Sequence, residues 1–294
     1  MSALRSIGFL LHPGEQHAVE HALARAQACG FAVWTAVDDP EGSVAEHADD
    51  TKLLVTVGGD GTFLYGARLA APRGIPVLGA NRGRLGFLAD IEMDALPEAI
   101  ARFASGDSFV QRRSLVEVTT NAVDPGPGGP PALALNEVVV RARGVNVVRL
   151  RVDADGELLG EFDSDGIVVA TATGSTAYAL SAGGPPVDPR LHVLVVVPLA
   201  PHAVISRPVV IPEAVRVAIV VEDGDVAIAA DGIPYGCLGG GGEVRIEPGP
   251  ELSVVRFANS PSFFMRLREK FHFGVPNKEV VAAPAELEER YGAS

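Results

Sequence analysis

The apolar run Lys52-Leu-Leu-Val-Thr-Val57 leads directly into Gly58-Gly-Asp-Gly-Thr62, and this junction is the most informative part of the chain. The run predicts a buried strand, and the glycines predict a turn with little side-chain bulk between backbone amides and a ligand. Thr62 is placed to cap a helix from Phe63 to about Ala71, whose first amides would face the same ligand. With Asp60 in the turn, the junction predicts a phosphate-handling site. A plain strand-to-helix turn, with Asp60 as a helix cap, is the alternative that a lone motif leaves open.

The residues around this junction alternate between strand and helix patterns. Strands are predicted at Ile7–Leu11, Phe31–Val37, Lys52–Val57 and Ile75–Gly79, a helix at Glu15–Cys29 ending at Gly30, and an acidic loop at Asp38–Asp50. Pro72 is expected to terminate the helix that follows Thr62. Such alternation predicts a parallel sheet wrapped by helices, with ligands beyond the carboxyl ends of its strands. The Asp60 loop lies at such an end.

After about residue 109 the chain reads as strands separated by turns. Leu150–Val152 and Leu158–Phe162 flank Asp155-Gly156, Val215–Val221 and Val226–Ala230 flank Asp223-Gly224, Asp124–Pro131 reads as a long surface loop, and Gly239–Gly242 as a turn. Helical spacing returns only after Pro261, and the last dozen residues are expected to be loose. We therefore predict an α/β domain over 1–108, a β-rich domain over 109–258, and a C-terminal helix and tail over 259–294.

Composition narrows the possible partners. A formal charge of -13 and only three lysines in 294 residues argue against a nucleic-acid or anionic-membrane surface. Phosphate groups must then be met by backbone amides, scattered arginines and metal. The two cysteines, Cys29 and Cys237, have no C-x-x-C spacing, and no leader or apolar stretch of about 20 residues is evident. We expect a soluble, cytoplasmic protein.

Other catalytic motifs are missing or weak. There is no G-x-x-x-x-G-K-[ST] and no H-R-D with D-F-G, so the chain resembles neither P-loop enzymes nor protein kinases. His17-Ala-Val-Glu-His21 matches the inverted zinc-peptidase pattern H-x-x-E-H. No third ligand at a suitable distance is evident, and two histidines on the polar side of a helix are common by chance. Zinc analysis of the purified protein would test that alternative.

Two further segments offer polar groups to a ligand. The apolar strand Ile167–Ala170 follows Asp165 and runs into Thr173-Gly-Ser-Thr176, a hydroxyl-rich turn able to cap a helix through Tyr178. A capped helix would explain the turn structurally, but a lone helix in a strand-rich half favours a ligand contact. Asn136-Glu137, before the strand Val138–Val140, can read hydroxyls or an adenine edge, although the pair alone carries little information.

Taken in series, these segments resemble the motifs of NAD kinases. The matching stretches are Gly58–Thr62, Asn81-Arg-Gly-Arg-Leu-Gly-Phe-Leu88, Asn136-Glu137, and Asp165-Gly166 with Thr173–Tyr178, in similar order and spacing over most of the chain. The resemblance implies an α/β domain related to the phosphofructokinase and diacylglycerol-kinase group, an all-β C-terminal domain, and a last helix that packs back on the first domain. It also implies a homodimer or homotetramer that uses divalent metal with ATP, or with polyphosphate in some members.

The implied reaction is transfer of the ATP γ-phosphoryl group to the 2'-hydroxyl of the adenosine ribose of NAD, giving NADP. Asp60 is the candidate general base, because a carboxylate can orient a weakly nucleophilic hydroxyl and accept its proton. No protein side chain is assigned to the metal, since Mg²⁺ is expected to be held mainly by ATP oxygens. The predicted NAD site comprises Asp60, Gly61, Asn136, Glu137, Asp165, Thr173, Gly174, Ser175, Thr176, Ala177 and Tyr178, and the phosphate loop comprises Gly58, Gly59, Gly61 and Thr62.

Several positions depart from the family pattern. Ala172 stands where proline is frequent, Tyr65 and Asp163 where arginine is frequent, and Ile233, after Asp231-Gly232, where glutamine or arginine is common. These departures leave the outer contacts to NAD and phosphate open. A carboxylate at Asp163 predicts a weaker preference for phosphorylated ligands such as NADPH.

Two other functions are compatible with parts of the sequence. A lipid kinase of the diacylglycerol or sphingosine type shares the glycine loop, but Thr173–Tyr178 and the acidic character of the chain speak against a membrane substrate. A nucleotide sensor without catalysis would keep the binding turns and lose the base, whereas Asp60 is present. The choices of ATP or polyphosphate as donor, of NAD or NADH as acceptor, the oligomer size and the regulation stay open.

Overall fold

The computed structural model describes residues 5–81, 86–121, 132–202 and 206–274, without the side chain of Gln16. The chain divides into two compact units, residues 1–258 and 259–294, and each is described by itself. The loop expected at Asp124–Pro131, the centre of the Asn81–Leu88 motif and the last dozen residues lie wholly or mostly outside the described ranges.

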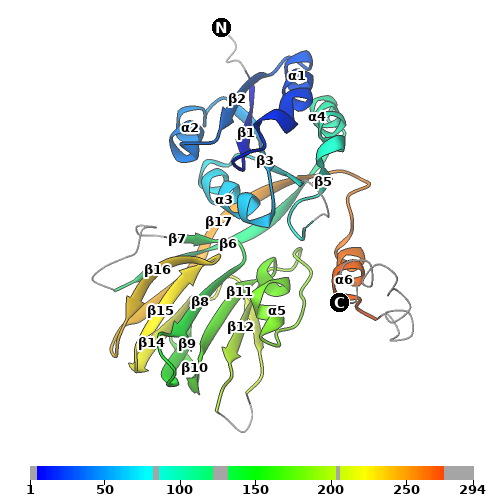
Figure 1. The fold of residues 1–294 in the computed structure, drawn as a ribbon. Coiled ribbons are helices and arrows are strands. Elements are labelled where there is room, and N and C mark those ends of the chain that lie inside the picture. Colours follow the sequence, from blue (N-terminus) through cyan, green and yellow to red (C-terminus); the bar gives the residue numbers. More distant parts are fainter. Residues whose placement is uncertain (1–4, 82–85, 122–131, 203–205, 275–294) are drawn as a thin grey trace, which may run out of the picture. The chain divides into compact units, whose positions relative to one another are not determined.

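The N-terminal part of the first unit is a parallel sheet covered by helices on both faces (Figure 1). Strands β1 (Ser6–Leu11), β2 (Ala32–Ala36), β3 (Thr51–Val57) and β4 (Val77–Asn81) pair in the order β4-β3-β1-β2, and the short β5 (Ile91–Glu92) pairs with β4. Helices α1 (Glu20–Ala28) and α4 (Leu96–Ser105) share one apolar cluster with the sheet, and α2 (Pro40–Glu46) and α3 (Asp60–Ala70) share another. Because both faces are covered, β1 is buried along its whole length. The predicted wrapped sheet is confirmed.

Local details differ from the expectations in three places. The helix expected from Glu15 begins with a 3-10 turn at Gln16–Val19, although Gly30 follows its end with a φ of +86° as expected of a stop. The acidic loop contains α2, whose cap Asp39 accepts a hydrogen bond from the Gly42 N–H at 3.0 Å. Helix α3 begins at Asp60 and its cap is Gly59, so the predicted capping role of Thr62 is wrong.

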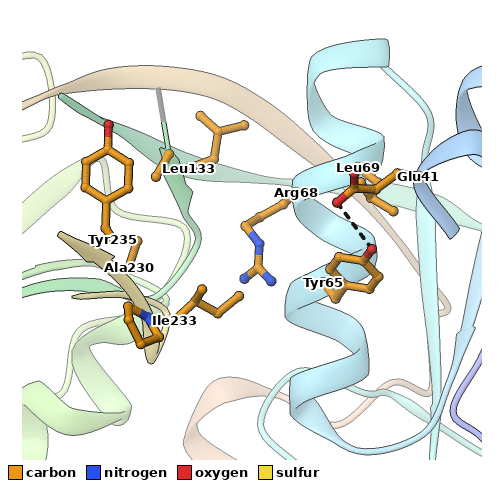
Figure 2. A pocket seen from close by; sticks show the side chains of 10 residues that line it. Glu41, Tyr65, Arg68, Leu69, Leu133, Ala230, Ile233 and Tyr235 are labelled. Atoms are coloured by element: carbon orange, nitrogen blue, oxygen red, sulfur yellow. Dashed lines mark hydrogen bonds between the residues drawn. The ribbon is translucent and has the colours of Figure 1, made fainter. Parts of the chain in front are cut away.

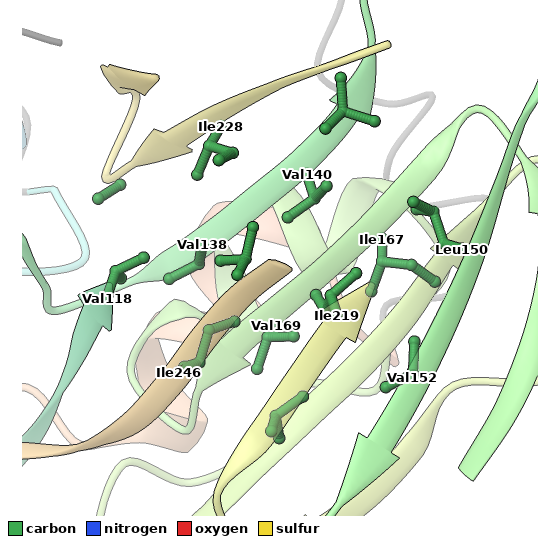
Figure 3. Packing of buried hydrophobic residues seen from close by; sticks show 14 of the residues in the cluster. Val118, Val138, Val140, Leu150, Val152, Ile167, Val169, Ile219, Ile228 and Ile246 are labelled. Atoms are coloured by element: carbon green, nitrogen blue, oxygen red, sulfur yellow. The ribbon is translucent and has the colours of Figure 1, made fainter. Parts of the chain in front are cut away.

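The rest of the first unit is a sandwich of two antiparallel layers. Its strands are β6 (Phe109–Thr120), β7 (Ala132–Ala134), β8 (Glu137–Ala142), β9 (Val148–Ala154), β10 (Glu157–Ser164), β11 (Gly166–Thr171), β12 (Val193–Leu199), β13 (Val209–Pro212), β14 (Val217–Asp223), β15 (Val226–Ala230), β16 (Ile233–Leu238) and β17 (Glu243–Arg256). One layer has the order β13-β12-β11-β8-β15-β16, and the other contains β10-β9-β14-β17 with β6 on β17. Apolar side chains of the two inner faces, such as Val140 and Ile246, interdigitate between the layers (Figure 3). The all-β prediction for this part is confirmed.

The two DG turns behave differently. Asp155-Gly156, with φ angles of +48° and +82°, joins β9 and β10 as a hairpin. The turn at Asp223-Gly224 instead joins β14 in one layer to β15 in the other, so the strands that flank it do not pair. Strand alternation identifies both strands but does not say which layer each joins.

Strand β17 makes the parallel sheet and one sandwich layer into a single continuous sheet (Figure 1). Val254 near its end pairs in parallel with Val77 of β4, while Val244 near its start pairs antiparallel with Ile219 of β14. Strand β6 runs antiparallel beside it from Phe109 to Thr120. The two halves of this unit are therefore joined by paired backbone rather than by a simple linker.

The second unit contains α6 (Phe263–Phe271), which begins two residues after Pro261. Its cap Ser262 accepts a hydrogen bond from the Met265 N–H at 3.2 Å. The packing of this helix on the first domain stays a prediction. Among the described helices, none has the length and apolar character needed to cross a membrane.

Candidate active site

A cavity lies where the order of the parallel strands reverses. From β1 the chain continues to β2 on one side, whereas β3 lies on the other side, and such switch points bind ligands beyond the strand ends. The cavity has a volume of about 490 Å³. It is lined by Leu10, Leu11, His12, Pro13, Val37, Pro40, Gly59, Gly61, Thr62 and Tyr65. The predicted phosphate loop therefore forms part of its wall.

The glycines of the loop serve two purposes. Gly58 has a φ of +151°, and a Cβ there would lie 2.4 Å from Thr62 Oγ1, so a side chain would be both strained and crowded. A Cβ on Gly59 or Gly61 would meet nothing within 4 Å, so these two glycines present bare backbone to open space. The first amides of a helix lack intrahelical acceptors, and those of α3 therefore suit an anionic ligand.

Asp60 is held in place by the segment that follows β4. Its Oδ2 accepts the Phe87 N–H at 3.1 Å and its Oδ1 accepts the Leu88 N–H at 3.3 Å. A Cβ on Gly86 would lie 2.1 Å from Asp60 Oδ1, so a side chain at this position would displace the Asp60 carboxylate. Each carboxylate oxygen keeps accepting capacity beyond its one amide bond, which leaves Asp60 able to bind a ligand hydroxyl.

The structure brings Asn136-Glu137 together with the Thr173 turn. The Thr171 N–H donates to the Asn136 carbonyl at 2.9 Å, and Thr171 Oγ1 donates to the Leu135 carbonyl at 2.6 Å. A Cβ on Gly174 would lie 2.0 Å from the Asn136 carbonyl oxygen. Two segments almost 40 residues apart in sequence thus form one compact wall, as the motif series predicts.

The turn itself differs from the predicted capped helix. A 3-10 turn at Gly174–Thr176 precedes a short α5 (Tyr178–Ser181), and neither has a side-chain cap. The fully buried Ser175 donates to the Ala172 carbonyl at 2.7 Å and accepts the Val187 N–H at 2.8 Å. The Ser175 hydroxyl makes these hydrogen bonds within the protein, so Ser175 stabilises the turn. Thr176 and Ala177 are half-buried and Tyr178 is exposed.

Asp165 is separated from the other predicted NAD residues. Asp165 precedes β11, and the Thr173 turn follows this strand. The six residues of β11, Gly166–Thr171, therefore put about 20 Å between Asp165 and the turn. A single chain does not bring Asp165 to Asn136. Asp163, on the neighbouring hairpin strand, bonds Arg149 at 2.8 and 3.2 Å, and this arginine lowers the pKa of the Asp163 carboxyl.

Asp231 is a site residue that sequence reasoning missed. It directly follows β15, and its side chain is fully buried. Its carboxylate accepts the N–H groups of Leu135 at 2.9 Å, Asn136 at 2.7 Å and Glu137 at 3.3 Å. Arg68 of α3 completes the set with an N···O distance of 3.4 Å. Burial raises the pKa of Asp231, and its hydrogen bonds and Arg68 oppose that rise. A DG dipeptide after a strand signals only a turn, which is why the sequence did not reveal the anchor.

Glu137 is a buried carboxyl group beside Asp231. Burial and then the Asp231 charge raise the pKa of Glu137 to about 7, against a smaller opposite effect of the Tyr178 N–H. Its Oε2 has no hydrogen-bond partner within the part of the chain that the structure describes. Near neutral pH this group is thus divided between its acid and carboxylate forms, as is common at functional sites.

A second cavity of about 330 Å³ lies beside Arg68 (Figure 2). Its lining is Glu41, Tyr65, Arg68, Leu69, Ala132, Leu133, Ala230, Ile233, Pro234 and Tyr235. The Tyr65 hydroxyl donates to Glu41 at 3.4 Å, and the Arg68 guanidinium lies 5.7 Å from the Tyr65 ring centre. Tyr65 lines both cavities, and Arg68 lines the second one.

The histidines of the H-x-x-E-H pattern lie on the surface. His17 is in the 3-10 turn, His21 is in α1, and the His17 ring contacts the Glu20 carboxylate at 3.3 Å. Among the described residues, no group of three or more His, Cys, Asp or Glu side chains is arranged to hold a metal ion.

This combination defines the class of the protein. A carboxylate in a glycine loop at the start of a helix, with a second polar wall in the same unit, supplies the groups that a small-molecule phosphotransferase uses. Models of the ATP-NAD kinase N-terminal and C-terminal domains match residues 7–108 and 135–257. The chain belongs to the NAD kinase family, whose enzymes phosphorylate NAD, and the resemblance seen in the motifs is confirmed.

Relatives and solved structures agree with this assignment. The NAD kinase of Heliobacterium modesticaldum is 38% identical over 81% of this chain and 84% of its own length. The NAD kinase of Thermococcus sibiricus is also 38% identical, over 76% of this chain and 80% of its own length. An NAD kinase from Archaeoglobus fulgidus in complex with ATP has a TM-score of 0.69 at 27% identity, covering 90% of this chain and 97% of its own. Yeast NADH kinase complexed with NADH shares the fold, with a TM-score of 0.78 at 22% identity over 94% and 90% of the two chains.

Proposed function

We propose that Asp60 is the general base that accepts the proton of the 2'-hydroxyl of the adenosine ribose of NAD while this hydroxyl takes the γ-phosphoryl group of ATP. The observation that carries the proposal is the position of Asp60. It stands at the carboxyl end of a switch-point strand, with both carboxylate oxygens fixed by backbone N–H groups of Phe87 and Leu88. A base must be held within hydrogen-bond reach of the proton that it accepts.

The cavity beside β1 is the proposed donor site. Its wall contains the backbone of Gly59 and Gly61, and the first amides of α3 favour phosphate oxygens there. ATP is the proposed donor, and polyphosphate would use the same anion-binding backbone. A divalent metal at this site would be held mainly by phosphate oxygens of the donor, because Mg²⁺ in such sites is commonly bound through substrate phosphates. When bound, such a metal neutralises charge on the transferring phosphoryl group.

The wall formed by Asn136, Glu137 and the Thr173 turn is the proposed acceptor site. The Asn136 amide and the partly protonated Glu137 can both donate and accept, which suits ribose hydroxyls and an adenine edge. Gly61 gives the ribose close access to Asp60, and Thr173, Gly174, Thr176, Ala177 and Tyr178 complete the wall. Asp165 stays a proposed NAD contact, although within one chain β11 separates it from the turn.

In the proposed reaction, the Asp60 carboxylate orients the 2'-hydroxyl and takes its proton. The freed oxygen attacks the γ-phosphorus in line with the leaving ADP, and the bond from the γ-phosphorus to the β,γ-bridging oxygen breaks. Fixed amides of the glycine loop offset the negative charge during transfer. Buried Asp231 and Arg68 do not touch the reacting atoms in this scheme; they set the backbone of the acceptor wall.

Replacing Asp60 with Asn tests the base. Because the amide cannot accept the hydroxyl proton, we expect kcat to fall by at least about 100-fold. The NAD dissociation constant should change much less than kcat, whereas the unfolding temperature should fall, because the Asn Nδ2 would face a backbone N–H of Phe87 or Leu88 that an oxygen of Asp60 accepts. Asp163→Asn, on the exposed hairpin, is the matched control and should keep normal turnover. Near-normal turnover of Asp60→Asn would remove Asp60 from this role.

We also propose that the protein is cytoplasmic and forms a homodimer or homotetramer. Strand β13 is the edge of its layer, and Val209 and Val210 on it are exposed, which supports strand or face contacts with a second copy. Light scattering of the purified protein gives the assembly mass directly, and a monomer at micromolar concentration would contradict the proposal.

A further inference from the structure

A partly buried network of polar side chains begins beside the segment that fixes Asp60. Asp90 lies two residues after Leu88, and its N–H donates to the Gly79 carbonyl of β4 at 3.2 Å. Its carboxylate accepts from Arg256 Nε of β17 at 2.6 Å, with only 11% of the arginine and 6% of the aspartate side chain exposed. The segment that holds Asp60 is thereby tied to the strand that joins the two halves of the fold.

The chain continues across β6 to the acceptor wall. Gln111 Oε1 accepts from Arg256 at 2.9 Å and from Arg113 at 3.2 Å, so two guanidinium groups share one neutral oxygen. Arg113 also donates to Thr173 Oγ1 at 3.4 Å. Five side chains, Asp90, Arg256, Gln111, Arg113 and Thr173, therefore connect the Asp60 segment with the turn assigned to NAD.

The charges of this side-chain network explain why it keeps its geometry. Two cations that share a neutral acceptor repel each other, and nearby carboxylates offset that repulsion. Arg256 forms an ion pair with Asp90. The charge of Arg113 is felt by Asp188, whose pKa is lowered mainly by its bond to Arg190 and further by the Arg113 charge. Gln111 is thus fixed from both sides, and a guanidinium donates in a planar fork that sets direction as well as distance.

We propose that Arg113, held through Gln111 and Arg256, is a positioning residue that sets the Thr173 turn, and the NAD bound there, in register with Asp60. The proposal rests on the acceptor site proposed above and deepens it. A register error of about 1 Å between a bound substrate and a catalytic group can lower the rate by two orders of magnitude, so a distant network of this kind can control turnover. Changes in this network should not alter ATP binding, because none of its five side chains lines the donor cavity.

The test compares Gln111→Met, Gln111→Glu and Arg113→Gln by steady-state kinetics with both substrates varied. Methionine keeps the length of glutamine but removes the strong shared acceptor, so kcat/KM for NAD should fall about 10-fold or more while KM for ATP stays within about twofold. Gln111→Glu keeps the acceptor oxygen and should therefore retain most of the wild-type kcat/KM for NAD that Gln111→Met loses. Arg113→Gln should behave like Gln111→Met. The neighbouring Arg112→Gln is the matched control, because Arg112 pairs with Glu251 on the surface and should leave all constants unchanged.

The outcomes separate this proposal from the assignment of the base. If Asp60→Asn is inactive but Gln111→Met and Arg113→Gln retain kcat/KM for NAD within twofold, the positioning role is overturned and the base assignment stands. Equal losses for ATP and NAD, together with a lower unfolding temperature and no rescue by Gln111→Glu, would show a purely structural network and also overturn it. Should Arg113→Gln fail to fold, Arg113→Lys, which keeps the charge and loses the fork, replaces it and is expected to lose kcat/KM for NAD in the same way.

Discussion

At the scale of single residues, three carboxyl groups in the site differ because their surroundings differ. Asp60 accepts two backbone N–H groups beside an open cavity, Asp231 accepts three while fully buried, and Glu137 is buried with an oxygen that lacks a partner among the described residues. Hydrogen bonds from donors favour the charged form of a carboxyl group and burial favours the neutral form, and at Asp231 and Glu137 the effect of burial on the pKa is the larger. Carboxyl groups thus supply a candidate base, a structural anchor and a group that titrates near neutrality.

Glu137 should make the stability of the protein fall as the pH rises. Its pKa is about 7 in the folded chain and 4.5 as the ordinary value, so between these limits the folded state holds more protons than the unfolded state. The contribution is fully present below pH 4.5 and is lost as the pH rises through 7. Relative to Glu137→Gln, the wild type should lose on the order of 2 kcal/mol between pH 4.5 and pH 8.

Urea unfolding of both proteins at several pH values measures this loss. Glu157→Gln, at an exposed position on β10, is the control and should follow the wild-type curve. Parallel pH profiles for the wild type and Glu137→Gln would mean that Glu137 titrates normally.

The positions of candidate site residues were predictable where a local motif marks them, and their roles stay proposals. Asp60, Asn136 and Thr173 stand in such motifs, and the structure places them on two walls as expected. Asp231 and Arg113 were not predictable, because their partners lie 95 and 60 positions away in the chain and only the fold brings them together. Ser175 shows the reverse case: its hydroxyl looked available in the sequence but bonds two backbone groups inside the protein.

At the scale of elements, glycine marks where two segments approach closely. Gly86 admits the backbone that binds Asp60, and Gly174 lets the Thr173 turn rest on Asn136, whereas Gly59 and Gly61 only leave backbone open. A sequence cannot distinguish these uses, because each depends on what lies opposite. The same limit applies to β14 and β15, whose alternation was clear but whose assignment to separate layers was not.

Gly174→Ala should separate the two parts of the acceptor wall. Its Cβ would lie 2.0 Å from the Asn136 carbonyl oxygen and 2.6 Å from the Asn136 Cα, and backbone cannot rotate away as a flexible side chain can. We expect a stability loss of about 1–3 kcal/mol and a raised KM for NAD. Gly144→Ala, whose Cβ would meet nothing within 4 Å, should stay within about 0.5 kcal/mol of the wild type. Thermal unfolding and steady-state kinetics with NAD measure the two effects. Equal stability and equal KM for NAD in the two variants would contradict the close contact between position 174 and Asn136.

At the scale of the whole first unit, a continuous sheet and two polar connections keep the walls of the site together. Strand β17 carries backbone pairing from β14 to β4, Arg68 joins α3 to Asp231, and the Gln111 network joins the Asp60 segment to Thr173. The class of fold followed from strand and helix periodicity. The connections did not, because the sequence shows only a change of pattern near residue 109, whereas β17 pairs with β4 from before that boundary and with β14 from after it.

Arg68→Gln should show how much one of these connections contributes. The Arg68 and Asp231 side chains are 16% and 0% exposed, so losing the cation leaves a buried carboxylate supported only by backbone N–H groups. We expect a loss of about 1–3 kcal/mol at pH 8. The loss should shrink as the pH falls, because a protonated Asp231 no longer needs the cation.

Arg216→Gln provides the matched control for that experiment. Arg216 meets Glu247 at the same 3.4 Å separation, but these side chains are 75% and 44% exposed, so solvent screens the pair and its removal should have no measurable effect. Urea unfolding of both variants at pH 8 and pH 4 compares two arginine–carboxylate pairs of equal separation and different burial. If the cost of Arg68→Gln were small or independent of pH, the ion pair would not hold α3 to the acceptor wall. The continuous sheet and the Gln111 network would then be sufficient to keep Asp60 in register with the Thr173 turn.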